Sequence, residues 1–194
     1  LLTGTSLILA YLAAIPIGIY SARKPYSLGD YVYSTSALIA MALPGFFVGM
    51  FFIFLFSVKL NWLPMSGMYT NTTNRSFWDL IKHLLMPAVC LAIQQIGTFM
   101  RQMRSNMLEV LGEDYIRTAR AKGLSEHRVI YVHALRNALS PMVTLFGTSI
   151  PFLVGGAVVT EQVFTWPGIG TLMIDSITAR DYPVIIGISV VVAV

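Results

Sequence analysis

Five long apolar stretches, separated by shorter polar segments, run along the chain. They cover residues 1–20, 32–58, 84–107, 138–160 and 183–194. A membrane-spanning helix needs about 20 mostly apolar residues, and each stretch reaches or approaches this length. The pattern therefore predicts an all-α, polytopic membrane protein in which these stretches cross the bilayer.

A charged segment, residues 108–137, separates the third stretch from the fourth. Within it, EDYIRTARAK (113–122) is predicted to form a short helix, because acidic residues at its start and basic residues at its end suit the helix dipole. Gly123 is expected to end this helix in a left-handed conformation, and Ser125 is a candidate N-cap for the next one. The segment is thus predicted to be a helix, a glycine elbow and a second helix.

Composition agrees with a membrane protein. The chain is 56% hydrophobic and 11% charged, whereas ordinary soluble domains are about 25% charged. The single cysteine, Cys90, excludes an intramolecular disulfide and a multi-cysteine metal site. The net charge of +4 comes from basic residues in the segments between apolar stretches, so membrane topology explains it better than nucleic-acid binding does.

The basic residues also predict the orientation in the membrane. Placing the segments that follow the first and third stretches on one side gathers nine of the 13 Lys and Arg residues there. This side is predicted to be cytoplasmic, so the segments 59–83 and 161–182 face outward. The first stretch lacks an initiator methionine and the last is short, so we expect one domain, 1–194, that continues beyond both ends.

Polar residues recur within the third stretch at steps of three and four, which places them on one face of a helix. They are Gln94, Gln95, Thr98 and Gln102. Two interpretations remain open: these side chains hydrogen-bond to neighbouring helices, or they form the polar wall of a solute pathway. Arg101 and Arg104 nearby are expected to extend toward the cytoplasmic interface.

The outward segment beginning EQVFTWPGIG has a different character. Its Trp166-Pro167-Gly168 run is expected to break the helix and form a turn, which would place a short re-entrant or surface element over the outer mouth. The alternative is an ordinary turn with an interfacial tryptophan.

Signatures of catalysis do not occur in the sequence. There is no glycine-rich phosphate loop ending in Lys-Ser or Lys-Thr, no H-E-x-x-H pair and no G-x-S-x-G elbow. We therefore expect neither enzyme activity nor a metal site in this chain, and an energy source supplied by a partner.

Two long segments carry a family resemblance. RTARAKGLSEHRVIYVHALRNALSP, followed by VVTEQVFTWPGIGTLMIDSITARDYPVI, resembles the permeases of dipeptide, oligopeptide and nickel ABC importers, as does LPMSGMY at 63–69. Against the general coupling-loop signature of such permeases, Ala119, Gly123 and Leu135 match. Arg117 stands where that signature has glutamate.

The resemblance implies a type I ABC-importer helical bundle in a bacterial or archaeal cytoplasmic membrane. Its implied partners are a second homologous permease subunit, two ATP-binding subunits, an extracytoplasmic substrate-binding protein and membrane lipid, without nucleic acid. No cofactor is expected on this chain, and ATP and Mg would bind the partner ATPases. The substrate would be a di- or oligopeptide. A nickel or other small-solute importer is an alternative, and a secondary transporter or channel is a more remote one.

The resemblance also implies two sets of functional residues. The expected contact with the ATPases comprises Tyr115, Arg117, Ala119, Arg120, Lys122, Gly123, Leu124 and Ser125. The expected outer mouth, where the binding protein delivers substrate, comprises Glu161, Trp166, Pro167, Gly168 and Asp175.

Overall fold

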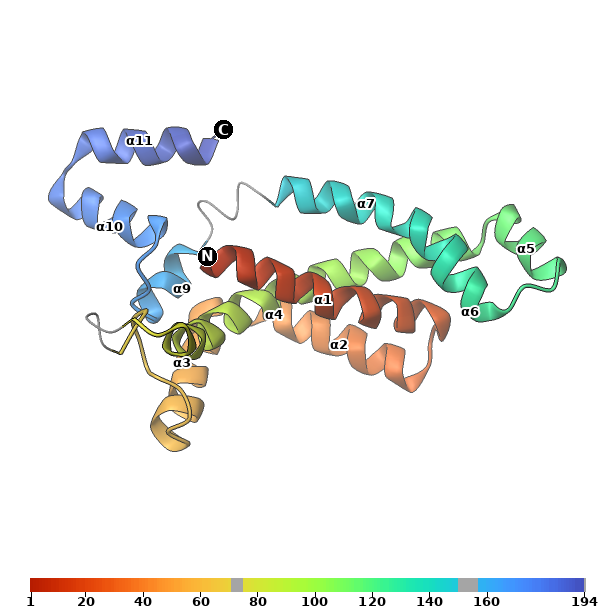
Figure 1. Cartoon of the computed structure of the whole chain (residues 1–194), viewed down its shortest axis with the longest axis horizontal. Coiled ribbons are helices and arrows are strands. Elements are labelled where there is room, and N and C mark those ends of the chain that lie inside the picture. Colours follow the sequence, from red (N-terminus) through yellow and green to blue (C-terminus); the bar gives the residue numbers. More distant parts are fainter. Residues whose placement is uncertain (71–74, 150–156, 194) are drawn as a thin grey trace. The chain divides into compact units, whose positions relative to one another are not determined.

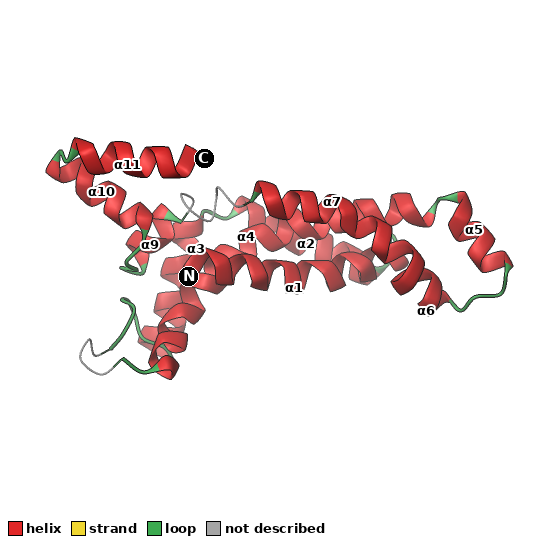
Figure 2. Cartoon of the chain, turned by 45° about the horizontal axis from the view of Figure 1, so that its top comes forward, coloured by secondary structure: helices red, strands yellow, loops and turns green. Residues whose placement is uncertain are grey.

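A computed structural model describes residues 1–70, 75–149 and 157–193. Helices and the loops between them account for these ranges, and no strand occurs within them (Figure 2). The all-α class predicted from the sequence is confirmed.

Within the part of the chain that the structure describes, two helices are long and apolar enough to cross a membrane. They are α1 (Leu2–Arg23) and α4 (Phe77–Leu111), of 22 and 35 residues. They correspond to the predicted stretches 1–20 and 84–107. A third crossing is available from α2 (Leu28–Ala42) together with Gly45–Lys59, which bend by 100° relative to each other.

The predicted stretch 32–58 is therefore not a single helix. It is broken between α2 and α3 (Gly45–Phe52), which continues as the π-helix η1 (Ile53–Lys59). Pro44 lies at the break with φ −61° and ψ 134°. Proline has no amide donor and disfavours helical geometry in the residue before it, so the first helix stops and a second begins in a new direction.

The last two predicted stretches are only partly comparable with the structure. Residues 138–160 overlap α7 (Leu135–Thr148), while residues 150–156 lie outside the described residues. The stretch 183–194 corresponds to α11 (Tyr182–Ala193), an apolar helix of 12 residues.

The chain folds as two compact units. The first contains Leu1–Leu9, Leu43–Ile93 and Ser149–Val194, and the second contains Ala10–Ala42 and Gln94–Thr148.

In the second unit, the later part of α1, α2, the later part of α4 and α7 run side by side (Figures 1 and 2). Glycines permit close approach between them. A Cβ at Gly18 would lie 2.7 Å from Cβ of Met103, and one at Gly97 would lie 2.8 Å from the carbonyl oxygen of Ala37. Small residues at such crossings allow helices to pack by van der Waals contact, which drives association where lipid surrounds the protein.

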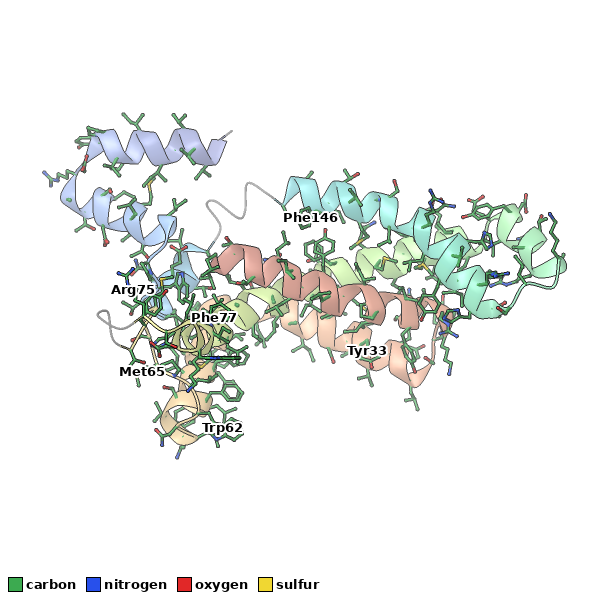
Figure 3. The ribbon with its side chains drawn as sticks, viewed as in Figure 1. Tyr33, Trp62, Met65, Arg75, Phe77 and Phe146 are labelled. Carbon is green, nitrogen blue, oxygen red and sulfur yellow. The ribbon has the colours of Figure 1, made fainter. Side chains whose placement is uncertain are left out.

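An aromatic cluster also joins the helices of the second unit. The ring centroid of Tyr11 lies 4.4 Å from that of Phe99 and 5.5 Å from that of Phe146, which Figure 3 labels on α7. The Tyr11 hydroxyl donates a hydrogen bond of 3.0 Å to the carbonyl oxygen of Met142. One side chain of α1 thus contacts both α4 and α7.

The first unit contains two apolar clusters of its own. One is built from Leu2, Ala88, Leu91, Ala157 and Trp166. The other is built from Val48, Met86, Cys90 and Phe164. Both join the early part of α4 to the segment around α9 (Val158–Val163).

A long connection in the first unit leads from η1 to α4. Figure 3 labels Trp62, Met65 and Arg75 on its described part and Phe77 at the start of α4. It is fastened to the α9 segment, since the backbone N–H of Gly67 donates to the carbonyl oxygen of Phe164 at 2.8 Å.

Candidate functional site

The helix predicted over 113–122 is α5 (Asp114–Ala121), which lies at one end of the second unit, beyond α4 and α6 (Glu126–Arg128) (Figure 1). Glu113 is its N-cap residue and not part of its first turn. The helix is therefore one residue shorter at each end than the sequence predicted.

The end of α5 has the geometry of a Schellman motif. Gly123 has φ +78°, its N–H donates to the carbonyl oxygen of Arg120 at 2.9 Å, and the N–H of Leu124 donates to that of Ala119 at 3.4 Å. This conformation favours glycine, as the sequence predicted. Ser125 is the N-cap residue of α6 with extended dihedrals, but its side chain makes no capping hydrogen bond.

One face of α5 is buried within the second unit. The helix contacts η2 (Val129–Ala134), and its buried residues are Ile116 and Ala119, with 0% and 8% of their surface exposed. Ala119 was expected to let a partner approach closely. In the structure its small side chain lies inside the unit, covered by the same chain.

The opposite face of α5 is exposed and carries ion pairs. An Arg117 Nη1 atom lies 3.3 Å from Oδ1 of Asp114, and Nε of Arg120 lies 2.8 Å from Oε1 of Glu126. Exposed pairs of this kind contribute about 0–1 kcal/mol each. Burying a side chain the size of Ile116 contributes roughly 1.5–3 kcal/mol, so apolar packing dominates the anchoring of α5.

A hydrogen bond links α5 to α7 as well. The amide of Asn137 donates to the Tyr115 hydroxyl oxygen at 2.6 Å. Because α6, η2 and α7 follow one another directly in the chain, α5 is fastened to the start of one nearly continuous helical run.

The four polar residues predicted on one face of the third stretch all lie on α4. Gln102 donates a hydrogen bond of 2.8 Å to Oδ1 of Asn106, and Asn106 donates one of 3.2 Å to the carbonyl oxygen of Ala138 on α7. Nε2 of Gln95 is buried and has no hydrogen-bond partner among the described residues. Thr98 and Gln102 are exposed and line a cavity of about 460 Å³. This face therefore contains both helix-joining and cavity-lining side chains.

A partly buried ion pair contributes Arg104 to the lining of that cavity. The Arg104 guanidinium on α4 binds the Asp30 carboxylate on α2, with 2.7 Å between Nη2 and Oδ2. The carboxylate also accepts hydrogen bonds from the hydroxyls of Ser21 and Ser34 and from the N–H of Tyr26. Arg104 was expected to extend toward the cytoplasmic interface, and its partner Asp30 lies in the segment that the sequence predicts to be cytoplasmic, so the structure adds a specific partner to that expectation. Neither side chain's sequence context identifies its distant partner.

The outer segment is organised around two buried side chains. Glu161 on α9 is 6% exposed, and Trp166, between α9 and α10 (Ile169–Ala179), is 3% exposed. Oε2 of Glu161 accepts the N–H of Thr171 at 2.9 Å. A carboxylate at this position satisfies a free donor in the first turn of α10 and opposes the positive end of its dipole.

The turn in this segment lies at Thr165, whereas the sequence suggested Pro167-Gly168. Thr165 has φ +50°, and the N–H of Trp166 donates to the carbonyl oxygen of Glu161 at 2.8 Å, which closes α9. Gly168 is extended, with φ −139° and ψ 178°. Its lack of a side chain serves another purpose, because a Cβ there would meet the carboxylate of Glu161.

The remaining residues expected at the outer mouth lie on the surface of this segment. Pro167, Gly168 and Asp175 line an open cavity of about 420 Å³ in the first unit. Trp166 lies beneath this surface, in the cluster with Leu2 and Leu91. Trp166 therefore supports the segment from inside, and Asp175 is an exposed charge on its surface.

Comparisons with known proteins bear on the whole chain. The family model described as "Binding-protein-dependent transport system inner membrane component" matches residues 14–194. The chain is 49% identical over 194 residues to the oligopeptide transport system permease protein AppB of Bacillus subtilis, covering 100% of this chain and 61% of that protein.

Other similar proteins carry related names. The di/tripeptide transport system permease protein DppB of Pseudomonas aeruginosa is 46% identical over 186 residues, covering 87% of this chain and 55% of that protein. The glutathione transport system permease protein GsiC of Salmonella choleraesuis is 43% identical over 184 residues, covering 95% and 57%. The chain thus spans less than two thirds of the length of these relatives.

Proposed function

Because the chain belongs to the family of binding-protein-dependent transport system inner membrane components, we propose that it is the transmembrane subunit of an ATP-driven importer of di- or oligopeptides. Members of this family are membrane permease subunits and not the ATPase itself. The chain is accordingly a component of the cytoplasmic membrane. The names of the similar proteins, which specify oligopeptides, di- and tripeptides and glutathione, support a peptide substrate.

The observation that carries the proposal is the construction of α5. It is a short, exposed helix anchored through Ile116 and Ala119 on η2, closed by Gly123, and linked by Tyr115 to α7. A helix anchored in this way moves as a nearly rigid body when a force acts on it. It is suited to receive movement from a water-soluble partner and to pass that movement into a membrane helix.

The exposed face of α5 is the proposed contact with two partner ATPase subunits, which bind ATP and Mg. Arg117, Arg120 and Lys122 make this face basic, and two of these three charges already pair within the chain. Lys122 forms no ion pair among the described residues, so it is the charge most available to an acidic partner surface.

We place the contact with an extracytoplasmic binding protein on the surface of α10, around Asp175. The buried pair beneath it, Glu161 and Trp166, holds the segment in shape. Asp175→Lys should lower the stimulation of ATP hydrolysis by loaded binding protein while leaving the melting temperature unchanged. Unchanged stimulation in a fully assembled complex would remove the binding-protein role from this surface.

The proposed function is tested by reconstituting the full-length permease into proteoliposomes with its second permease subunit and its ATPases. Uptake of a labelled dipeptide should require ATP, loaded binding protein and all the subunits. The matched control is the same complex with Ile116→Asp, which removes the apolar anchor of α5 and should abolish coupling. Uptake without ATP, or by the lone chain, would instead identify a secondary transporter or channel.

A further inference from the structure

The cavity of about 460 Å³ in the second unit lies between α2 and α4. Its lining is mainly polar and consists of Ser34, Met41, Thr98, Arg101, Gln102, Arg104, Ser105 and Leu108. The volume falls within the range of about 300–1,000 Å³ found for small-molecule sites.

The two guanidinium groups of this cavity differ in their partners. That of Arg104 is held by Asp30 through two hydrogen bonds, so its charge is compensated. Arg101 is exposed, and the contact recorded for its Nη1 atom is with the sulfur of Met41 at 3.9 Å. Within the described residues Arg101 has no acidic partner. The cavity thus carries one uncompensated positive charge beside neutral hydrogen-bonding groups.

The depth of Arg101 in the membrane restricts the surroundings that this face of α4 can have. The helix α4 has 35 residues, which is about 50 Å at about 1.5 Å per residue, against a hydrocarbon core of about 30 Å. Arg101 lies inside the predicted spanning stretch 84–107, roughly 9 Å from its cytoplasmic end. Charged and polar side chains at such depth avoid lipid and face protein or water, so the exposed stripe of Thr98, Arg101 and Gln102 fits a water-filled path.

We propose that Arg101 binds the free carboxylate of a peptide substrate in this cavity, as a weak site on the cytoplasmic half of the pathway. The inference rests on the proposed function and adds a specific substrate contact to it. A guanidinium presents paired N–H donors that match a carboxylate. The side chains of Gln102, Thr98 and Ser34 supply donors and acceptors that suit peptide amides. One guanidinium in a hydrated cavity binds weakly, which a transport path requires for release.

The test measures binding without the binding protein, which would add its own specificity. Saturation-transfer difference NMR would be recorded for dialanine and for dialanine amide, each added to the purified complex in nanodiscs of neutral phosphatidylcholine. We expect a signal for dialanine, and an apparent affinity about tenfold lower for dialanine amide, because the amide cannot form charge-assisted hydrogen bonds with a guanidinium as a carboxylate does. This comparison needs no mutation.

Two variants locate the site. Arg101→Gln should abolish the preference for the free carboxylate, and Arg101→Lys should keep part of it. Arg23→Gln is the matched control, because it removes an exposed positive charge from the same unit outside the cavity. Copurification of the ATPases verifies assembly of each complex. An equal preference in wild-type and Arg101→Gln complexes would overturn the proposal.

A lipid headgroup is the competing occupant. If dialanine gives no signal in phosphatidylcholine, and phosphatidylglycerol binds the wild-type complex more tightly than Arg101→Gln, then the cavity is a phosphate-binding lipid site and the proposal fails. Failure of the proposed function looks different, because the wild-type complex would then take up no dipeptide in proteoliposomes. Normal uptake combined with no effect of Arg101→Gln would remove only the present inference.

Discussion

Arg104 on α4 holds Asp30 on α2 through two parallel hydrogen bonds, from Nε to Oδ1 at 2.8 Å and from Nη2 to Oδ2 at 2.7 Å. The Asp30 side chain is 5% exposed and that of Arg104 is 23% exposed. Removing one partner leaves a poorly solvated charge, so Asp30→Ala should lower the free energy of unfolding by about 3 kcal/mol. Denaturant unfolding of the purified protein in detergent measures this change.

The double variant Asp30→Ala with Arg104→Ala distinguishes pairing from unrelated packing losses. Its destabilisation should be smaller than the sum of the two single changes by about 0.5–3 kcal/mol. Arg117→Ala is the matched control, because its pair with Asp114 is exposed and should contribute less than about 1 kcal/mol. Strict additivity at Asp30 and Arg104 would contradict the assigned pair.

Gly123 is predicted to be required for coupling only because of its left-handed backbone conformation. It has φ +78°, and a Cβ built on it meets nothing within 4 Å. Gly123→Val should therefore strain the elbow by about 1–3 kcal/mol and lower the ATP hydrolysis that loaded binding protein stimulates. Gly123→Asn should retain most of that stimulation, since asparagine tolerates the left-handed region. Equal loss in both variants would point to a contact with the side-chain position instead.

Gly170 is predicted to be required for packing of α10 against α9. A Cβ there would lie 2.7 Å from Cα and from Cγ2 of Val158. The backbone at Val158 cannot move aside as the end of a flexible side chain can. Gly170→Ala should therefore destabilise the protein by about 1–3 kcal/mol. Gly187→Ala on α11 is the control, because nothing lies within 4 Å of its added carbon. Equal melting temperatures of the two variants would mean that α9 and α10 are not packed so closely.

The orientation predicted from nine basic residues on one side and four on the other can be checked by thiol labelling. Ser125→Cys should react only from the cytoplasmic side and Ser66→Cys only from outside. Both positions are exposed. Native Cys90 is 1% exposed and should stay unlabelled. Reaction of Ser125→Cys from outside would place α5 where no ATPase can reach it.

Local patterns in the sequence predicted the structure of residues 113–125 well. The charge order of EDYIRTARAK and the glycine that follows identified α5 and its elbow, because helix ends depend on neighbouring residues. The inward orientation of Ala119 could not be read in this way. It depends on η2, which lies further along the chain, and an alanine looks the same whether it faces a partner or its own core.

The same local patterns could not predict contacts between residues that are far apart in the sequence. Asp30 and Arg104 are 74 residues apart, and neither position indicates the other. Gly168 was interpreted as part of a turn because Pro-Gly commonly forms one, whereas the structure uses it to make room for Glu161. The sequence did contain a signal for this role of Gly168. The acidic residue Glu161 precedes two glycines in an apolar segment, and a buried carboxylate needs both space and hydrogen-bond donors.

The anchoring of α5 by apolar burial has a consequence for a cell whose ionic strength varies. Coulomb interactions between exposed charges weaken as salt rises, with a screening length of about 8 Å at physiological concentration, while the burial of Ile116 is insensitive to such screening. When the ionic strength of the cytoplasm rises, the affinity of α5 for a charged partner should fall, while the position of the helix within its unit should not change. If the exposed face of α5 is the ATPase contact, as we propose, docking there would weaken at high ionic strength while the packing of α5 against η2 is retained.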